Sequence, residues 1–215
     1  RMSGEQVCDI KGRFSVTGDL EEACKDADIV IEAIIEDKAA KMDILGKISK
    51  LVRPDTLIAT NSSYMVSSTF KNVVSHPERF ANLHYFMPAL VMKLVEVVKG
   101  EHTSQETIDR LMAFAREVGK TPVYVRKEED GFIVNNVLKA IKEEAYRLVS
   151  EGVCTPRDLD TAVELGLNHP MGPFKIDDMN GLDLRYDILK RRYQETGVKS
   201  YGYDMIEDLC KQGRY

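Results

Sequence analysis

The chain has 215 residues, a length that accommodates one large domain or two small ones. Its 30 basic and 35 acidic side chains are interleaved and leave a net charge of −5, so no basic face for nucleic acid is indicated. No apolar run approaches the roughly 20 residues that a membrane-spanning helix requires. The composition therefore predicts a globular protein without a nucleic-acid or membrane partner.

Cysteine usage indicates the compartment and argues against a metal site. Cys8, Cys24, Cys154 and Cys210 form no C-x-x-C pair, and none lies near two histidines at the spacing of metal ligands. We therefore predict four reduced thiols and no bound metal. Reduced thiols are typical of intracellular proteins, and no secretory signal is visible, so we expect a cytoplasmic location.

The first half of the sequence alternates short apolar runs with amphipathic stretches. Residues 14–18 are a short strand candidate that ends at a glycine. Asp19 is a plausible helix N-cap, and Glu22 completes a capping-box-like pattern. The strand–helix–strand order that follows is a βαβ unit, whose crossover should be right-handed. The predicted elements are helix 19–24, strand 28–36, helix 37–52 and strand 56–60.

Two later apolar runs each contain a polar residue that a core does not need. His84 lies in the run 83–86, and Glu96 lies in the β-branched run 94–98. A carboxylate inside such a run is costly to bury without a partner, and His84 is the nearest candidate along the chain. A glutamate that accepts from one imidazole nitrogen leaves the other free to take a proton, and it favours the protonated ring.

Residue spacing alone leaves other interpretations open. His84 can be a satisfied core histidine, and Glu96 can face solvent on an edge strand. Glu36 and residues 61–63 fall at the carboxyl ends of predicted parallel strands, where ligands of open α/β sheets bind. Glu36 can equally be a carboxylate favoured by a helix N-terminus, and residues 61–63 can be an N-cap for a short helix from Met65.

The second half changes from an α/β pattern to helices only. A charged linker, residues 126–130, marks the change, and we place the domain boundary there, with domains at residues 1–127 and 128–215. The predicted elements are helix 104–118, strand 121–125, a helix from 131 to 152, a helix from 156 to 165 capped by Thr155, and two further helical stretches that end near 194 and 211.

Three linked motifs resemble the N-terminal domain of the 3-hydroxyacyl-CoA dehydrogenases. The family patterns are close to T-N-T-S-S, L-H-F-F-N-P and M-K-L-V-E-V, and here they stand at residues 60–64, 83–88 and 92–97. The second half also resembles that family, with G-F-I-V-N at 131–135 and the second-domain signature at 165–183. The resemblance implies a partial Rossmann-type, doubly wound parallel sheet followed by an all-α C-terminal domain.

The resemblance also implies roles for individual residues. It makes His84 the catalytic base and Glu96 its partner. It places Ser63 between cofactor and substrate, and it brings Asn135 to the substrate from the helical domain. On its own, Asn135 reads as a satisfied polar residue in the first turns of a helix.

The cofactor implied by the resemblance is NAD, and the choice of NAD over NADP rests on the resemblance alone. Glu36 and Lys41 match family residues that contact the dinucleotide, together with Ser63. Met87 stands where the family has an asparagine that contacts the cofactor, and a methionine cannot hydrogen-bond there in the same way.

Two further departures from the family concern the ends of the nucleotide-binding domain. No G-x-G-x-x-G occurs in the chain, although such a loop holds the dinucleotide pyrophosphate at a helix N-terminus. We therefore expect this sequence to be part of a longer polypeptide. The loop at residues 128–130 is one residue longer than in the family, which can alter the hinge between domains.

The sequence therefore predicts an NAD-dependent 3-hydroxyacyl-CoA dehydrogenase that oxidises a (3S)-3-hydroxyacyl-CoA to the 3-ketoacyl-CoA. The alternative is a non-catalytic fragment that binds acyl-CoA or serves in dimerisation and has lost the nucleotide-binding half. In either case the apolar stripes of the helical half predict a homodimer through that half.

Overall fold

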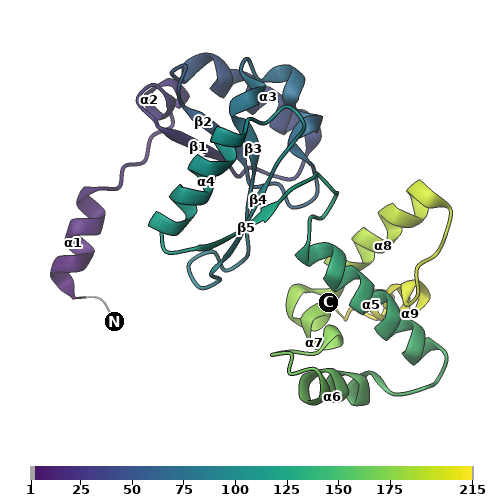
Figure 1. Cartoon of the computed structure of the whole chain (residues 1–215). Helices are drawn as coiled ribbons and strands as arrows, with labels where there is room; N and C mark the ends of the chain where they lie inside the picture. The colour runs from purple at the N-terminus through teal and green to yellow at the C-terminus, as the bar shows by residue number, and fades with distance from the viewer. Residues whose placement is uncertain (1–2, 215) are drawn as a thin grey trace. The chain divides into compact units, whose positions relative to one another are not determined.

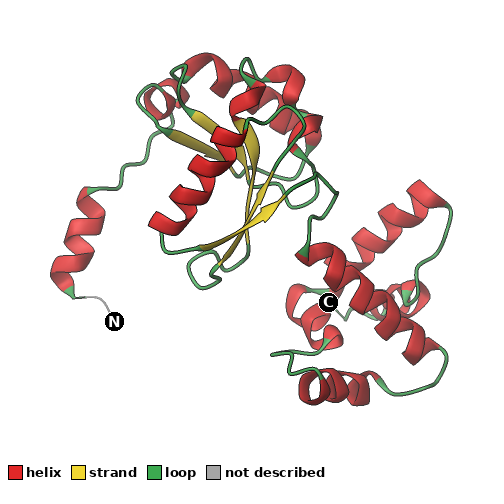
Figure 2. Ribbon diagram, in the orientation of Figure 1, coloured by secondary structure: helices red, strands yellow, loops and turns green. Residues whose placement is uncertain are grey.

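The computed structural model describes residues 3–214 of the chain. The chain divides into two compact units, Arg1–Ile133 and Val134–Tyr215, which are shown in Figure 1. The first unit contains strands and helices, and the second contains helices and loops (Figure 2). Among the described helices, none is both long enough and apolar enough to cross a membrane.

The first unit is built on a five-stranded sheet whose strands follow one another in chain order. The first three strands and the last two are parallel within each group, and β3 and β4 pair antiparallel. The connection from β3 to β4, residues 86–93, is too short for a parallel crossover, so the chain reverses instead. The strands are β1 Ile29–Glu32, β2 Leu57–Thr60, β3 Phe80–Tyr85, β4 Leu94–Val98 and β5 Thr121–Val125.

Helices cover both faces of this sheet. Helix α4, Gln105–Glu117, packs Ile108 and Leu111 against one face. Helices α2, Leu20–Cys24, and α3, Lys38–Leu51, cover the other face, as Figure 1 shows. Three short 3₁₀ helices, Ser67–Thr69, Lys71–Val73 and Pro77–Arg79, complete the unit. The predicted fold class, a partial Rossmann-type α/β sheet followed by a helical domain, is confirmed.

Three helices of the first unit begin at a capping side chain, and one of these caps, Asp19, was predicted from the sequence. Asp19, Asp37 and Ser104 each accept a backbone N–H of the first turn, which would otherwise lack a partner. The capping box predicted at Asp19 is wrong in one respect. The Glu22 carboxylate accepts from the Thr17 hydroxyl at 2.7 Å, and that hydroxyl accepts the Asp19 N–H.

Two predicted strands of the first unit differ in the structure. Residues 14–18 form no strand, and the preceding residues form helix α1, Gly4–Gly12. Phe14 and Val16 are 73% and 83% exposed, so these apolar side chains are not buried against a neighbouring strand. Strand β1 ends at Glu32 rather than at residue 36, because the Glu32 carboxylate accepts the N–H of Ile34 and draws the chain out of the ladder.

The second unit contains three helices after residue 172, where the sequence predicted two. Gly181, with φ of +94°, separates the first two of them. Helix α5 begins at Val134 instead of residue 131, because Gly131 and Phe132 both have positive φ, at +79° and +53°. The helices are α5 Val134–Ser150, α6 Pro156–Gly166, α7 Pro173–Asn180, α8 Leu182–Thr196 and α9 Tyr203–Lys211.

A buried polar network lies inside the helical unit. Asp177 of α7 is 2% exposed and pairs with the Lys142 ammonium of α5. Its other oxygen accepts from the Tyr146 hydroxyl at 2.9 Å and lies 3.6 Å from Nε of Arg185. One carboxylate therefore pairs with Lys142 and lies within ion-pair distance of Arg185, and burial together with Asp177 raises the pKa of Tyr146.

This network predicts that Asp177→Asn is strongly destabilising. The change keeps the size of the side chain and leaves Lys142 and Arg185 buried without a counter-charge, so we expect a loss of about 3–5 kcal/mol in the free energy of unfolding. Asp178→Asn, on an exposed position of the same helix, is the control and should change stability by less than about 0.5 kcal/mol. Urea denaturation measures both, and equal effects would contradict the network.

Candidate active site

Polar residues collect where the first three strands end and β4 begins. The residue pairs Glu32↔Thr60, Thr60↔Asn82 and His84↔Glu96 lie directly opposite each other in the sheet. Since side chains alternate along a strand, these five side chains share one face of the sheet. Ligands of open α/β sheets bind at this carboxyl edge.

His84 and Glu96 form a buried pair within that group. Nδ1 of His84 lies 2.9 Å from Oε2 of Glu96, and the two residues are 3% and 0% exposed. An ionised carboxylate can only accept, so Nδ1 is the donor in this pair, and in a neutral ring Nε2 is the nitrogen that can accept a proton. The interpretation of Glu96 as a solvent-facing residue on an edge strand is wrong, because β4 lies between β3 and β5.

The surroundings of the pair fix both of its members. The second Glu96 oxygen, Oε1, accepts the backbone N–H of Ile133 at 3.0 Å. The His84 ring packs against two aromatic rings, with centroid distances of 4.6 Å to Phe86 and 5.3 Å to Phe132. An imidazole held in this way can present one nitrogen in a defined direction.

A second buried pair joins Glu32 to Lys41, which are 3% and 1% exposed. Lys41 Nζ lies 2.7 Å from Oε1 of Glu32, and Thr60 donates to Oε2 at 2.6 Å. Lys41 Nζ also lies 3.3 Å from Oε2 of Glu36. The lysine is therefore held between two carboxylates, which places Glu36 at the same edge of the sheet as Thr60.

The Glu36 carboxylate collects donors from the turn after β2. It accepts from the Ser62 hydroxyl, and from the backbone N–H groups of Ser63 at 3.2 Å and Tyr64 at 3.4 Å. Partial burial by itself raises the pKa of the Glu36 carboxyl. The Ser62 hydroxyl, the Lys41 charge and the Tyr64 N–H outweigh that effect and hold this pKa below its ordinary value of 4.5.

The structure brings some of the predicted site residues together. His84 pairs with Glu96, and Glu36 lies beside Lys41 and Ser63. Met87 follows β3 with 82% of its surface exposed. Asn135 is half-buried in the first turn of α5, in the second unit.

Sequence reasoning missed Glu32 at this edge and did not anticipate the contact made by Asn61. Glu32, a carboxylate in an apolar run, carried the same signal as Glu96 and could have been found by it. Asn61 Oδ1 accepts the N–H of Tyr85 at 2.8 Å, which joins the end of β2 to the end of β3. The alternative interpretation of residues 61–63 as the cap of a helix from Met65 differs from the structure: Ser62 Oγ accepts the Met65 N–H at 2.9 Å in a turn, and a short 3₁₀ helix begins at Ser67.

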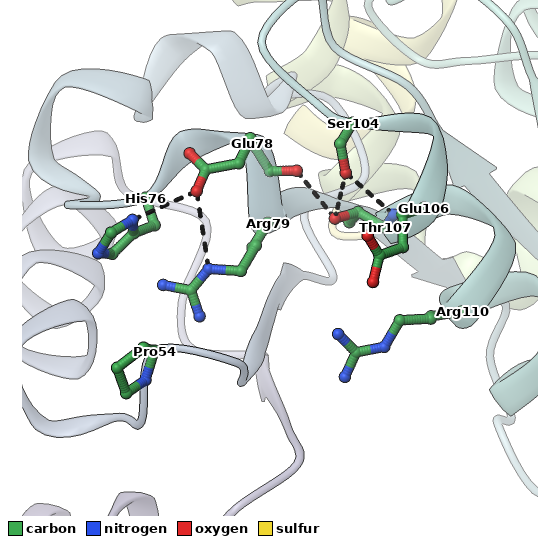
Figure 3. Close-up of a pocket in the computed structure, with 8 residues that line it drawn as sticks. All are labelled: Pro54, His76, Glu78, Arg79, Ser104, Glu106, Thr107 and Arg110. Carbon is green, nitrogen blue, oxygen red and sulfur yellow. Dashed lines mark hydrogen bonds and ion pairs between the residues drawn. The ribbon is translucent and has the colours of Figure 1, made fainter.

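A separate surface pocket of about 390 Å³ lies at the opposite edge of the sheet (Figure 3). Its arginines hold backbone carbonyls. Arg79 donates to Arg53 and Thr56, and Arg110 donates to Asp55. These bonds tie the start of β2 to the start of β3 and to α4, so the pocket is a structural junction. Its lining is Pro54, His76, Glu78, Arg79, Ser104, Glu106, Thr107 and Arg110.

The largely parallel sheet with polar residues at its carboxyl edge defines an α/β protein with a candidate ligand site at that edge. Comparison with known families narrows this class. Residues 1–129 match the 3-hydroxyacyl-CoA dehydrogenase NAD-binding domain, and residues 131–215 match the C-terminal domain of the same family. The chain belongs to the 3-hydroxyacyl-CoA dehydrogenase family.

Individual relatives agree with this assignment. A protein of Bacillus subtilis (strain 168) named "Probable 3-hydroxybutyryl-CoA dehydrogenase" is 39% identical over 196 residues, which are 91% of this chain and 68% of the relative. The 3-hydroxybutyryl-CoA dehydrogenase of Clostridioides difficile is 37% identical over 84% of this chain, which spans 64% of that protein. The structure of (S)-3-hydroxybutyryl-CoA dehydrogenase from Ralstonia eutropha superposes with a TM-score of 0.87 at 31% identity, over 99% of this chain and 75% of that one.

The family assignment confirms the predictions of the oxidoreductase class and of NAD at the level of the family. The chain spans about two-thirds of the length of these bacterial relatives. Within residues 3–214, the structure has no group of three or more His, Cys, Asp or Glu side chains that could hold a metal ion.

The lowered pKa of Glu36 predicts a pH-dependent contribution to stability. A carboxyl whose pKa falls on folding stabilises the fold above its unfolded pKa, and this contribution is lost as pH falls through the folded pKa. Relative to Glu36→Gln, the wild type should therefore be more stable near pH 7, and the difference should shrink below pH 4.5. Urea denaturation at several pH values measures it. Glu101→Gln, at an exposed position, is the control, and a difference between wild type and Glu36→Gln that is constant with pH would contradict the assignment.

Proposed function

We propose that the protein catalyses NAD-dependent oxidation of a (3S)-3-hydroxyacyl-CoA to the 3-ketoacyl-CoA. The observation that supports this most is the buried His84–Glu96 pair at the carboxyl edge of the sheet. The family to which the chain belongs and the relatives named for this activity give the reaction class. The reaction is one of fatty-acid β-oxidation or butanoate metabolism.

The chemistry assigned to this pair is proton transfer from the substrate hydroxyl. Nε2 of His84 accepts that proton while the carbon loses its hydride, and the ring becomes an imidazolium. Glu96 accepts from Nδ1, keeps the ring in the productive tautomer and stabilises the positive charge that develops. Burial of both side chains excludes water, which strengthens this charge interaction.

NAD, when bound, supplies the acceptor for the hydride. A carboxylate at the edge of the sheet fits the hydroxyl-bearing part of a dinucleotide, because it can accept hydrogen bonds. Glu36 is ionised near neutral pH, and its side chain is 37% exposed, so its carboxylate can accept from a ribose hydroxyl. Lys41 is 1% exposed and is assigned the role of holding this carboxylate in place. Met87 offers an exposed thioether and no donor.

The remaining roles concern the substrate and the compartment. Ser63, beside Glu36, and Asn135, in the first turn of α5, are the side chains proposed to hold the substrate oxygens. All four cysteines are free thiols, which supports the proposed cytoplasmic location.

The proposal predicts that His84→Ala lowers turnover far more than stability. A positioned base contributes roughly 10²- to 10⁴-fold in rate, so we expect a loss of that order when NADH-dependent reduction of acetoacetyl-CoA is followed by absorbance. Glu96→Gln should be nearly as damaging, because an amide cannot stabilise the imidazolium. His76→Ala, an exposed histidine at the opposite edge of the sheet, is the control. Substantial turnover by His84→Ala would refute the assignment.

Calorimetric titration separates this proposal from the non-catalytic alternative. NADH and then acetoacetyl-CoA are titrated into the wild-type chain, and we expect both to bind. Glu36→Gln should weaken NADH binding and leave acetoacetyl-CoA binding unchanged. Binding of acetoacetyl-CoA without NADH would favour a fragment that binds acyl-CoA and does not catalyse the reaction.

We further propose a homodimer formed through the helical unit. Leu165 and Leu167 at the end of α6 and Met179 of α7 are between 65% and 82% exposed, and an interface between two copies would remove this apolar surface from water. Light scattering at micromolar concentration should therefore give the mass of two chains, and Leu165→Asp should shift it towards one. Val16→Asp, on the first unit, is the control. A wild type with the mass of one chain would refute the dimer.

A further inference from the structure

The segment after β5 is anchored at its start by Glu128. Oε1 of Glu128 accepts from the Ser67 hydroxyl at 2.7 Å and from the Ser68 N–H at 2.9 Å. Ser67 is fully buried, and its own N–H donates to Oδ1 of Asn82 at 2.7 Å. Asn82 lies on β3, two residues before His84 on the same face. Glu128 is therefore tied, through one serine, to the strand that carries His84.

The same segment reaches the His84–Glu96 pair at its other end. The Ile133 N–H donates to Oε1 of Glu96, and the Phe132 ring packs against the His84 ring. Phe132 is 3% exposed and packs with Val98, which follows Glu96 on the same face of β4. His84 thus contacts Phe132, and Glu96 contacts the next residue, Ile133.

The backbone between these two ends is held in an uncommon conformation. Gly131 has φ of +79°, and Phe132, which is not a glycine, has φ of +53°. The Phe132 N–H closes a turn on the Glu129 carbonyl at 2.9 Å. A residue other than glycine with positive φ costs about 1 kcal/mol or more, and this conformation persists only where the surrounding structure holds it. The anchor at Glu128 is one such restraint.

The groups that face Glu128 are arranged around this anchor. His102 Nε2 lies 3.4 Å from Ser67 Oγ, and burial lowers the pKa of His102, against the opposing effect of Glu128. Gly100 leaves the space that both occupy, since a Cβ there would lie 2.4 Å from Cε1 of His102 and 2.9 Å from Oε1 of Glu128. The carboxylate is thus packed closely on its donors.

We propose that Glu128 is a positioning residue for the His84–Glu96 pair. By fixing the start of the segment on Ser67 and Ser68, it fixes the Phe132–Ile133 backbone, which in turn orients Glu96 and the His84 ring. Glu128 touches neither reacting group. The effect of Glu128 on turnover rests on the function proposed above, whereas its effect on the orientation of the His84 ring does not.

The test compares Glu128→Ala, Glu128→Gln and Ser67→Ala with the control Glu129→Ala, an exposed neighbour in the same segment. Two quantities are measured on the full chain: kcat and KM for acetoacetyl-CoA reduction by NADH, and the proton NMR signal of the His84 Nδ1–H. That proton exchanges slowly with water because it is buried and bonded to Glu96. Circular dichroism verifies that each variant is folded.

Glu128→Ala should lower kcat about tenfold with KM for NADH unchanged, because orientation is lost while cofactor contacts remain. Its Nδ1–H signal should broaden. Glu128→Gln, which keeps an oxygen that accepts from both serines, should restore the signal and most of kcat. Ser67→Ala should have a smaller effect in the same direction, and Ser67→Ala combined with Glu128→Ala should be no worse than Glu128→Ala alone.

An unchanged kcat and an unchanged His84 signal in Glu128→Ala would overturn the inference, as would an equal effect of Glu129→Ala. If Glu128→Ala does not fold, the kinetic constants and the His84 Nδ1–H signal of Glu128→Gln and Ser67→Ala decide whether the inference holds. If the wild type has no turnover, the proposed function fails, and the His84 signal alone then decides whether Glu128 positions the pair.

Discussion

Burial of the Glu96 carboxylate is the constraint on which the rest of the candidate site depends. The residue lies in the middle of β4 and is 0% exposed. An ionised carboxylate in such a place costs several kcal/mol unless its oxygens are paired. His84 on the neighbouring strand satisfies one oxygen, and the Ile133 N–H satisfies the other. The pairing that makes this burial possible also leaves His84 with one ring nitrogen for proton transfer.

The same constraint recurs at Glu32 and Asp177 with a different chemical outcome. Glu32 is matched by Lys41 and Thr60, and Asp177 by Lys142, Tyr146 and Arg185. An ammonium or guanidinium group has donors and no lone pair, so these partners cannot, like an imidazole, offer one nitrogen as a donor and the other as a proton acceptor. Histidine is the partner that can both satisfy a carboxylate and accept a proton, and this distinguishes Glu96 from Glu32 and Asp177.

Much of the fold follows from sequence, because caps and apolar periodicity are local signals. The pairing of His84 with Glu96 could be anticipated for the same reason, since one is the only histidine and the other the only carboxylate of its apolar run. The predicted strand at residues 14–18 was wrong because a strand needs a neighbour, and composition does not report one. The donation from Ile133 could not be predicted, because a backbone N–H has no sequence signal.

That backbone donor has a consequence for the way the site is controlled. A main-chain N–H is placed by the path of the chain, so the orientation of Glu96 depends on residues that set this path and not on a side chain at position 133. Gly131 and Phe132 adopt positive φ there, a conformation that the surroundings must hold. Packing of Phe132 with Val98 and Val125 supplies one restraint, and the Glu128 carboxylate supplies another at the start of the segment. The geometry of the buried pair is thus a property of the segment after β5 as much as of the two strands that carry it.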